Sequence, residues 1–148
     1  MLEAENCELY AVAGRSLEKA EAFKNEFGFE KAYGDYESLL ADPEVKAVYI
    51  PLPNHLHLEW IKKAAEAGKH VLCEKPMCLN VEELKEAFDT CKKNNVTIIL
   101  SHVNEQPYKT MEKGGFIEKI GAENFCAHID DALARFDRVF SNIAVVEG

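Results

Sequence analysis

Several signals that would place this chain in a specialised class are missing from it. No CxxC spacing occurs and the five cysteines are an odd number, which speaks against both a disulfide framework and a zinc ribbon. No apolar run approaches the roughly 18 residues of a membrane span. The first residues lack the basic and then apolar pattern of a signal peptide. We therefore expect a cytoplasmic protein with reduced thiols and no membrane partner.

An excess of positive charge is also missing. The net charge is −9 and no stretch gathers lysine and arginine, so a nucleic-acid partner is not expected. The 148 residues fit one domain, predicted over 1–148, because domains of roughly 100 to 200 residues are usual. Hydrophobic residues make up 47% of the chain and charged residues 29%, which is typical of soluble globular proteins.

What the chain does have is a regular alternation of β-like and α-like segments. Short connections between them indicate parallel βαβ units, and hence an α/β fold. We expect strands over 7–13, 29–34, 45–51, 69–74 and 96–102, with the one at 45–51 buried on both faces. Helices are expected over 17–27, 36–41, 54–67 and 81–93, followed by helices over 107–113 and 130–140 and a last strand over 142–147. Ser16, Asn54 and Asn80 are predicted to cap helices, and Gly28 to end one.

The most informative segment is Cys73-Glu74-Lys75-Pro76, at the end of an apolar strand. Ligands of parallel α/β sheets bind outside the carboxyl ends of the strands. A lysine fixed there by a proline is therefore placed to touch a substrate.

Together with other motifs, this segment carries a specific resemblance. The motifs are Gly14-Arg15-Ser16 with Lys19, Tyr33-Gly34-Asp35-Tyr36, the run from Val48 to His57 (VYIPLPNHLH), the run from Ala67 to Pro76 (AGKHVLCEKP), and Asn80. In this order they resemble the nucleotide-binding domain of the glucose-fructose oxidoreductase, inositol dehydrogenase and MocA family. The resemblance covers residues 7–102 and leaves 103–148 as a divergent C-terminal extension. It implies a Rossmann-like parallel sheet with helices on both faces, NAD or NADP as cofactor, a sugar, cyclitol or similar small alcohol as substrate, and a homo-oligomer.

The chain departs from that family in two places. It begins at what would be the second strand and has no G-x-G-x-x-G, the loop whose backbone N–H groups bind the pyrophosphate. After Leu100 it leaves too few residues for the family's substrate domain. We expect the sheet to be incomplete or rearranged at its centre. The empty position would be filled by residues 143–147, by direct pairing of the flanking strands, or by a strand from a second copy, and we favour the first.

The resemblance makes Lys75 the catalytic residue, whose ammonium group polarises the substrate oxygen during hydride transfer. The alternative is a solvated loop lysine. Pro76 restricts the backbone of Lys75, with a cis bond as one form of that restriction, or simply ends the strand. Glu74 contacts the cofactor ribose or fixes Lys75, or else is a solvated carboxylate.

Arg15, Ser16 and Lys19 follow the expected strand at 7–13, where a family member binds the ribose of its cofactor. No acidic residue occupies positions 13–16, and basic groups suit the 2′-phosphate, so NADP is favoured over NAD. The alternative is that Ser16 caps the helix while Arg15 and Lys19 are simply exposed.

The resemblance also assigns the nicotinamide side of the crevice to a second loop. Its residues are Pro51, Leu52, Pro53, Asn54 and His57. His55 and His57 suggest a metal, but no further ligand stands nearby in sequence, so no metal is predicted. Cys73 and Cys78 flank the lysine and are interpreted as inert thiols rather than reactive ones.

Two functions remain open on this basis. The first is a truncated NAD(P)-dependent oxidoreductase domain, which descends from an active enzyme and lacks the loop that binds the pyrophosphate. The second is a non-catalytic module for dimerisation or protein interaction that descends from the same fold.

Overall fold

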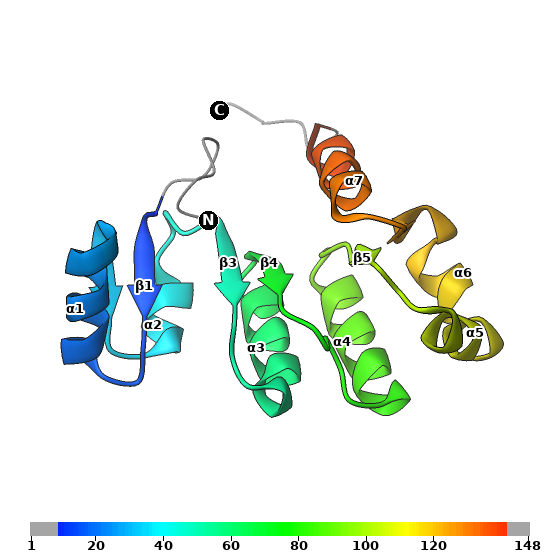
Figure 1. Ribbon diagram of the computed structural model, residues 1–148, viewed down its shortest axis with the longest axis horizontal. Helices are drawn as coiled ribbons and strands as arrows, with labels where there is room; N and C mark the ends of the chain where they lie inside the picture. Colours follow the sequence, from blue (N-terminus) through cyan, green and yellow to red (C-terminus); the bar gives the residue numbers. More distant parts are fainter. Residues whose placement is uncertain (1–8, 142–148) are drawn as a thin grey trace. The chain divides into compact units, whose positions relative to one another are not determined.

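The computed structural model describes residues 9–141 and divides into two compact units, on either side of the junction between Leu79 and Asn80. The elements of the first unit are β1 (Ala11–Ala13), α1 (Leu17–Phe27), β2 (Lys31–Tyr33), α2 (Tyr36–Ala41), β3 (Ala47–Ile50), α3 (Asn54–Glu66) and β4 (His70–Cys73) (Figure 1). Those of the second are α4 (Val81–Lys93), β5 (Leu100–Ser101), α5 (Glu105–Lys113), α6 (Phe116–Ile120), a 3-10 turn (Ala122–Asn124), β6 (Phe125–Cys126) and α7 (Ile129–Ser141). The prediction of a single domain over 1–148 stays a prediction.

The strands of the first unit form two separate parallel pairs. β1 pairs with β2 from Ala11 opposite Lys31, and β3 pairs with β4 from Ala47 opposite His70. Within the described residues β1 and β3 do not pair with each other. The alternative that the flanking strands fill the empty position by pairing directly is therefore wrong. The parallel α/β architecture that is incomplete at its centre is thereby confirmed. The strand that we favoured for the empty position, residues 143–147, lies outside the described residues.

β3 corrects one expectation. A strand buried on both faces was predicted over 45–51, but Ala47 and Tyr49 are exposed while Ile50 is buried. Ala47 and Tyr49 are two residues apart and therefore share one face of the strand, and within the described residues that face is not fully covered. An apolar run signals that a strand is buried in some context, but does not say which neighbours are present.

Helix caps follow the sequence in three of four places. The Ser16 side chain accepts from the Lys19 N–H, Gly28 ends α1 in the left-handed conformation at φ 78°, and Asn80 Oδ1 accepts from the Glu83 N–H at 2.8 Å. Asn54 was expected to cap α3, and this is wrong. It is the first residue of the helix, and Pro53 holds the cap position without a side-chain bond.

A polar network at the amino ends of the strands joins the two pairs. The Asp42 carboxylate accepts from Lys31 Nζ at 2.9 Å and from the Tyr33 hydroxyl at 2.6 Å, and the Tyr10 hydroxyl lies 3.4 Å away. The Asp42 carbonyl oxygen accepts from Lys69 Nζ at 2.6 Å, just before β4 begins. One buried aspartate thus connects residues beside β1, β2 and β4.

This network sets the ionisation of its members. Hydrogen bonds from Tyr33 and Lys31 lower the pKa of Asp42 well below its usual range. Hydrogen bonds to Tyr10 and Asp42 raise the pKa of Lys31, and the bond to Asp42 raises the pKa of Tyr33. We name these four side chains, Tyr10, Lys31, Tyr33 and Asp42, the Asp42 network.

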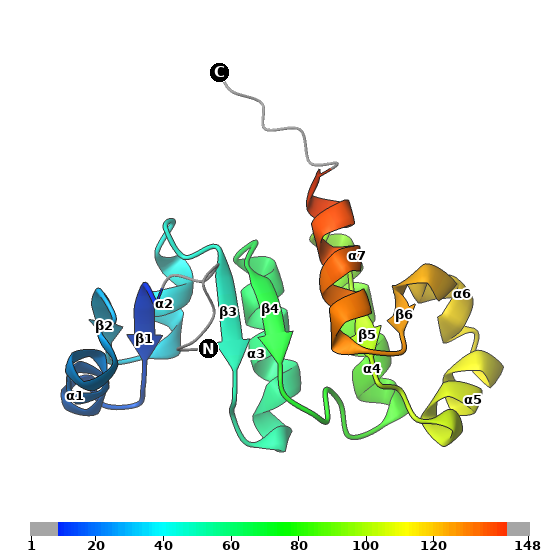
Figure 2. The same ribbon diagram turned by 45° about the horizontal axis from the view of Figure 1, so that its top comes forward.

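Apolar packing completes each unit separately. In the first unit α3 buries Trp60, Ile61, Ala64 and Ala65, and the Tyr36 ring meets Trp60 edge-on at 4.8 Å between centroids. The core of the second unit is built by Phe88, Met111, Phe116 and Ile120, beside the parallel pair β5 and β6 (Figure 2). No helix among the described residues is long and apolar enough to cross a membrane.

Candidate functional site

The carboxyl ends of β3 and β4 lie side by side in the first unit. Their pairing runs in register to Ile50 opposite Cys73, and the Glu74 N–H still donates to the Ile50 carbonyl oxygen at 3.2 Å. The arrows of β1, β3 and β4 point the same way in both views (Figures 1 and 2). The segments that follow these three strands therefore emerge at one end of the unit, where the sequence places every predicted site residue.

Lys75 stands one residue beyond the last hydrogen bond of the β3–β4 pair. Its side chain is exposed, and within the described part of the chain it has no ionic or hydrogen-bonding partner. The bond between Lys75 and Pro76 is cis, one of the forms expected for it. The lysine is thus free to approach a molecule bound at this end.

Glu74 is held by a tyrosine that the sequence analysis did not single out. The Tyr49 hydroxyl donates to Glu74 Oε1 at 2.5 Å, and this bond raises the pKa of Tyr49. The bond fixes the carboxylate beside Lys75 without pairing it to the lysine. The signal that would reveal Tyr49 is its register opposite Leu72, which appears only when the strands are paired.

His57 lies under this site rather than at its surface. Its side chain is fully buried at 0% exposure. Nδ1 lies 2.7 Å from the Pro76 carbonyl oxygen and Nε2 lies 2.6 Å from the Leu52 carbonyl oxygen. Both ring nitrogens are therefore occupied by backbone groups, one in the loop after β3 and one in the loop after β4.

The rest of the loop after β3 is open to solvent. Pro51, Pro53 and Asn54 are exposed and Leu52 is half-buried. This loop and Lys75 are brought to the same end by the β3–β4 register. Asn54 and the two prolines thus keep the surface position that a lining role requires.

Arg15, Ser16 and Lys19 follow β1 at the start of α1. The Ser16 hydroxyl is engaged with the Lys19 N–H as the helix cap, which fits the structural alternative for this residue. Arg15 and Lys19 are exposed, and within residues 9–135 neither forms an ion pair. Two unpaired cations therefore stand at the carboxyl end of β1.

The Cys73 thiol beside the lysine is not activated. Burial raises the pKa of Cys73 to about 11, so its nucleophilic thiolate form is suppressed. Cys78 is half-buried. The described residues hold no group of three or more His, Cys, Asp or Glu side chains arranged to bind a metal ion.

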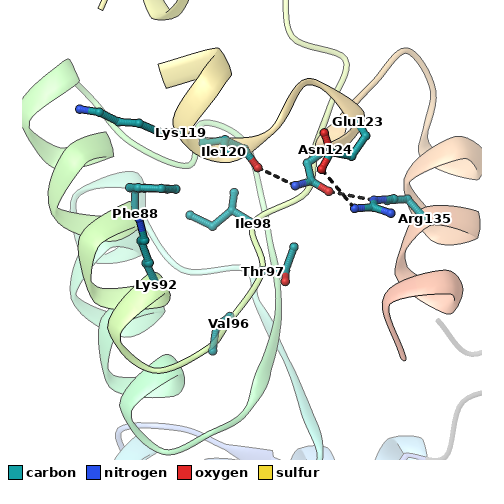
Figure 3. Close-up of a pocket in the computed structure, with 10 residues that line it drawn as sticks. All are labelled: Phe88, Lys92, Val96, Thr97, Ile98, Lys119, Ile120, Glu123, Asn124 and Arg135. Atoms are coloured by element: carbon teal, nitrogen blue, oxygen red, sulfur yellow. Dashed lines mark hydrogen bonds and ion pairs between the residues drawn. The ribbon is translucent and has the colours of Figure 1, made fainter. Parts of the chain in front are cut away.

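A cavity of about 480 Å³ lies in the second unit and is lined by residues of that unit (Figure 3). Asn124 borders it, with Nδ2 donating to the Ile120 carbonyl oxygen at 2.6 Å and Oδ1 accepting from Arg135 Nε at 2.9 Å. Val96 and Ile98 supply apolar lining. None of the residues assigned to catalysis or cofactor binding lines this cavity.

Comparison with known proteins places these features in a family. The family described as "Oxidoreductase family, NAD-binding Rossmann fold" matches residues 1–102, which is most of the chain. The chain belongs to this family. The resemblance stated from the motifs is thereby confirmed, and the match ends where the divergent extension was predicted to begin.

Relatives with known sequences agree. An uncharacterized oxidoreductase of Rhizobium meliloti is 58% identical over 89 residues, which is 60% of this chain and 27% of the relative. The NADP-dependent D-xylose 1-dehydrogenase 2 of Haloferax volcanii is 46% identical over 98 residues, which is 66% of this chain and 30% of the relative. The chain thus spans less than a third of the length of either relative.

Solved structures point the same way. A 3-ketoreductase from Actinomadura kijaniata in complex with NADP and TDP-benzene superposes with a TM-score of 0.61 at 33% identity, covering 77% of this chain and 36% of that one. A levoglucosan dehydrogenase in complex with NADH and levoglucosan gives a TM-score of 0.57 at 39% identity, covering 62% and 25%. The family to which the chain belongs therefore includes members solved with either nicotinamide cofactor.

Proposed function

We propose that the protein is an NAD(P)-dependent oxidoreductase domain that takes part in hydride transfer to or from a sugar, a cyclitol or another polyol. The observation that carries this proposal is the exposed, unpaired Lys75 at the carboxyl ends of β3 and β4, beside the loop of Pro51, Leu52, Pro53 and Asn54. Family membership and the oxidoreductase relatives support the same conclusion.

Lys75 acts in this proposal through its charge. Its ammonium group donates a hydrogen bond to the substrate oxygen, which carries negative charge as the carbon–hydrogen bond forms or breaks. A nicotinamide cofactor, when bound, supplies or accepts the hydride. Glu74, fixed by Tyr49, lies beside the lysine as an acceptor for a ribose or substrate hydroxyl. Exposed prolines at 51 and 53 stiffen the loop that faces the nicotinamide.

Cofactor preference is proposed to depend on the cations after β1. Arg15 and Lys19 are exposed and unpaired among the described residues, which suits a 2′-phosphate and hence NADP. The Ser16 hydroxyl already caps α1. Ser16 therefore contributes the backbone groups at the start of this helix and not a free hydroxyl. The donor set fits the phosphate of NADP better than the bare ribose of NAD.

Partners and location complete the proposal. The ligand is a small sugar or polyol, the protein is a homo-oligomer, and neither nucleic acid nor a membrane is a partner. Four described cysteines, Cys73, Cys78, Cys91 and Cys126, are free thiols, which supports a reducing, cytoplasmic setting.

A second candidate function rests on a different observation. β1 and β3 each have a strand edge with no partner among the described residues, and such edges accept further strands. This favours the alternative of a non-catalytic dimerisation or protein-interaction module. The two candidates differ in whether the protein binds a nicotinamide cofactor.

Fluorescence titration with NADPH separates them. We expect saturable binding at micromolar concentration, followed by turnover of NADP with a panel of aldoses and polyols. Lys75→Ala should bind NADPH as the parent does and lose turnover, whereas Lys93→Ala, which removes an exposed lysine in the second unit, should change neither. An absence of any response up to millimolar NADPH and NADH would reject the oxidoreductase proposal and favour the interaction module.

A further inference from the structure

The His57 ring has an arrangement that ordinary packing does not require. It is the largest of the side chains that are fully buried in the described residues, and both of its nitrogens meet backbone carbonyl oxygens. Carbonyl oxygens only accept hydrogen bonds, so the ring donates to them through its N–H and faces both acceptors from one buried position.

The two acceptors belong to the two loops of the proposed site. Leu52 lies between the prolines that follow β3, and Pro76 directly follows Lys75 after β4. His57 itself sits in the first turn of α3, on the element that the loop after β3 enters. One buried ring therefore spans from the cofactor-facing loop to the lysine loop.

We propose that His57 is a positioning residue that fixes Lys75 relative to the loop of residues 51–54 by bridging the carbonyl oxygens of Leu52 and Pro76 with its two ring nitrogens. This inference rests on the proposed function, which gives the position of Lys75 relative to the loop of residues 51–54 its importance. It differs from the expectation that His57 itself lines the cofactor site, because a fully buried ring with both nitrogens engaged acts through the backbone of its neighbours.

The loops after β3 and β4 must be held in a fixed position relative to each other for Lys75 to meet a substrate beside the cofactor. The β3–β4 ladder ends at the bond from Glu74 to Ile50, so neither loop is held by the sheet beyond that point. A displacement of a reacting group by about 1 Å costs on the order of 100-fold in rate. A side chain that holds both loops from below supplies the restraint that the ladder no longer provides.

Amide hydrogen exchange tests the restraint without any cofactor. In the full chain, His57→Ala should raise exchange about tenfold or more in peptides covering 51–56 and 74–79, and leave the segment around the Asp42 network unchanged. His55→Ala, which removes an exposed imidazole two residues away, should leave all of these peptides unchanged. Ile61→Ala serves as a control for lost packing of α3 alone and should not loosen the two loops together.

Chemical rescue tests the hydrogen bonding of the bridge. Imidazole added to His57→Ala can fill the space and donate through its N–H, so it should restore protection in both loops. 1-Methylimidazole has nearly the same shape but no N–H in its neutral form, so it should restore less protection than imidazole does. Equal rescue by the two compounds, or unchanged exchange in His57→Ala, would overturn the proposal.

Two further measurements cover a variant that does not fold. His57→Gln keeps a polar group of similar reach but offers a single nitrogen, so protection should fall in one loop and persist in the other. In the unaltered protein, ¹⁵N–¹H correlation of the imidazole rings should show a His57 N–H that exchanges slowly with water, and this signal should disappear in His57→Gln. A His57 N–H that exchanges as fast as that of an exposed ring would reject the bridging hydrogen bonds.

Turnover then links the restraint to the site. His57→Gln should lower kcat about tenfold with the KM for NADP changed less than twofold, because the lysine is displaced while the cofactor contacts remain. If the unaltered protein binds no cofactor, the proposed function fails while hydrogen exchange still decides the role of His57. If turnover is normal in a variant whose loops exchange freely, the positioning role fails and the proposed function stands.

Discussion

The two ends of the strands in the first unit are built from opposite chemistry. At the amino ends the buried Asp42 carboxylate is satisfied by Lys31 and Tyr33, and its carbonyl oxygen by Lys69. At the carboxyl ends Lys75 is an exposed cation with no partner among the described residues. The satisfied end connects the two strand pairs, and the unsatisfied end is where the proposed function places the ligand. Stability and activity should therefore respond to different substitutions.

The largest difference between the effect on activity and the effect on stability is expected for a substitution at the carboxyl ends of the strands. Lys75→Ala should lower kcat by about 100- to 1000-fold, because a donor aimed at the developing negative charge is lost. The melting temperature should change by no more than about 2 °C, because the side chain is exposed and unpaired. Steady-state kinetics and calorimetry on the same samples measure both. A marked loss of stability would show that the lysine also supports the fold and would weaken the contrast.

At the amino ends the expected effect is on stability. Asp42→Ala should lower the melting temperature by roughly 10 °C, because it leaves Lys31, Tyr33 and their neighbours without the acceptor they share. Asp89→Ala, an exposed carboxylate in the second unit, is the matched control and should have little effect. Thermal unfolding followed by circular dichroism would decide. An unchanged melting temperature in Asp42→Ala would mean that the network does not join the strand pairs.

The same network predicts how stability depends on pH. The pKa of Asp42 is lowered on folding, so its contribution is present above the ordinary value of 3.8 and is lost as the pH falls below that value. The pKa values of Tyr33 and Lys31 are raised from 10.0 and 10.5, so their contributions are lost as the pH rises above about 10. The melting temperature should be highest between about pH 7 and 9 and fall on both sides, because the lowered pKa of His70 adds to the acid limb and the raised pKa values of Cys73 and Cys91 add to the alkaline limb. Asp42→Asn should flatten the acid limb, and a curve identical to that of the parent would contradict this account.

A more moderate effect is expected for the cations after β1. Arg15→Ala should weaken NADPH binding about tenfold and NADH binding less than twofold, because only the former cofactor carries the 2′-phosphate. Lys24→Ala, on the same helix but paired with Glu21, is the control and should change neither affinity. Competition titrations with the two cofactors measure the ratio. Equal losses for NADPH and NADH would reject the assignment of Arg15 to the phosphate.

The smallest effect is predicted for the tyrosine that holds Glu74. Tyr49→Phe removes a single exposed hydrogen bond and should lower kcat about two- to threefold, with no detectable change in melting temperature. Glu74→Gln keeps the shape of the acceptor and tests whether its charge matters. A loss in Tyr49→Phe as large as that in Lys75→Ala would make Tyr49 a principal residue of the site instead of a supporting one.

Local signals in the sequence predicted much of this arrangement. The bounds of α1, α2 and α4, the caps at Ser16 and Asn80, and the position of Lys75 follow from periodicity, capping residues and the proline after the strand. These features depend on neighbours within one turn of helix or a few residues of strand, which are visible in a linear sequence. The predicted strand over 96–102 proved to be strand only at Leu100–Ser101, because pairing with β6 reaches no further.

The roles of Asp42, Tyr49 and His57 could not be predicted in the same way. In the sequence Asp42 only follows the helix predicted over 36–41, yet it accepts from side chains 9 and 11 residues away and, through its carbonyl oxygen, from one 27 residues away. Tyr49 meets Glu74 only because of the strand register. Long-range contacts of this kind depend on which strands pair and in what register, which periodicity does not specify.

By itself, the sequence determined the alternation of parallel α/β elements, the family, and the place of the lysine after a strand, because each depends on local patterning of residue types. Only the tertiary structure decided that β1 and β3 stay apart, that one aspartate joins the amino ends, and that a buried histidine bridges the two loops at the carboxyl ends. The physical reason is that burial and hydrogen-bond satisfaction are properties of the assembled chain. A polar residue has no fixed role until the fold brings a partner within about 3 Å.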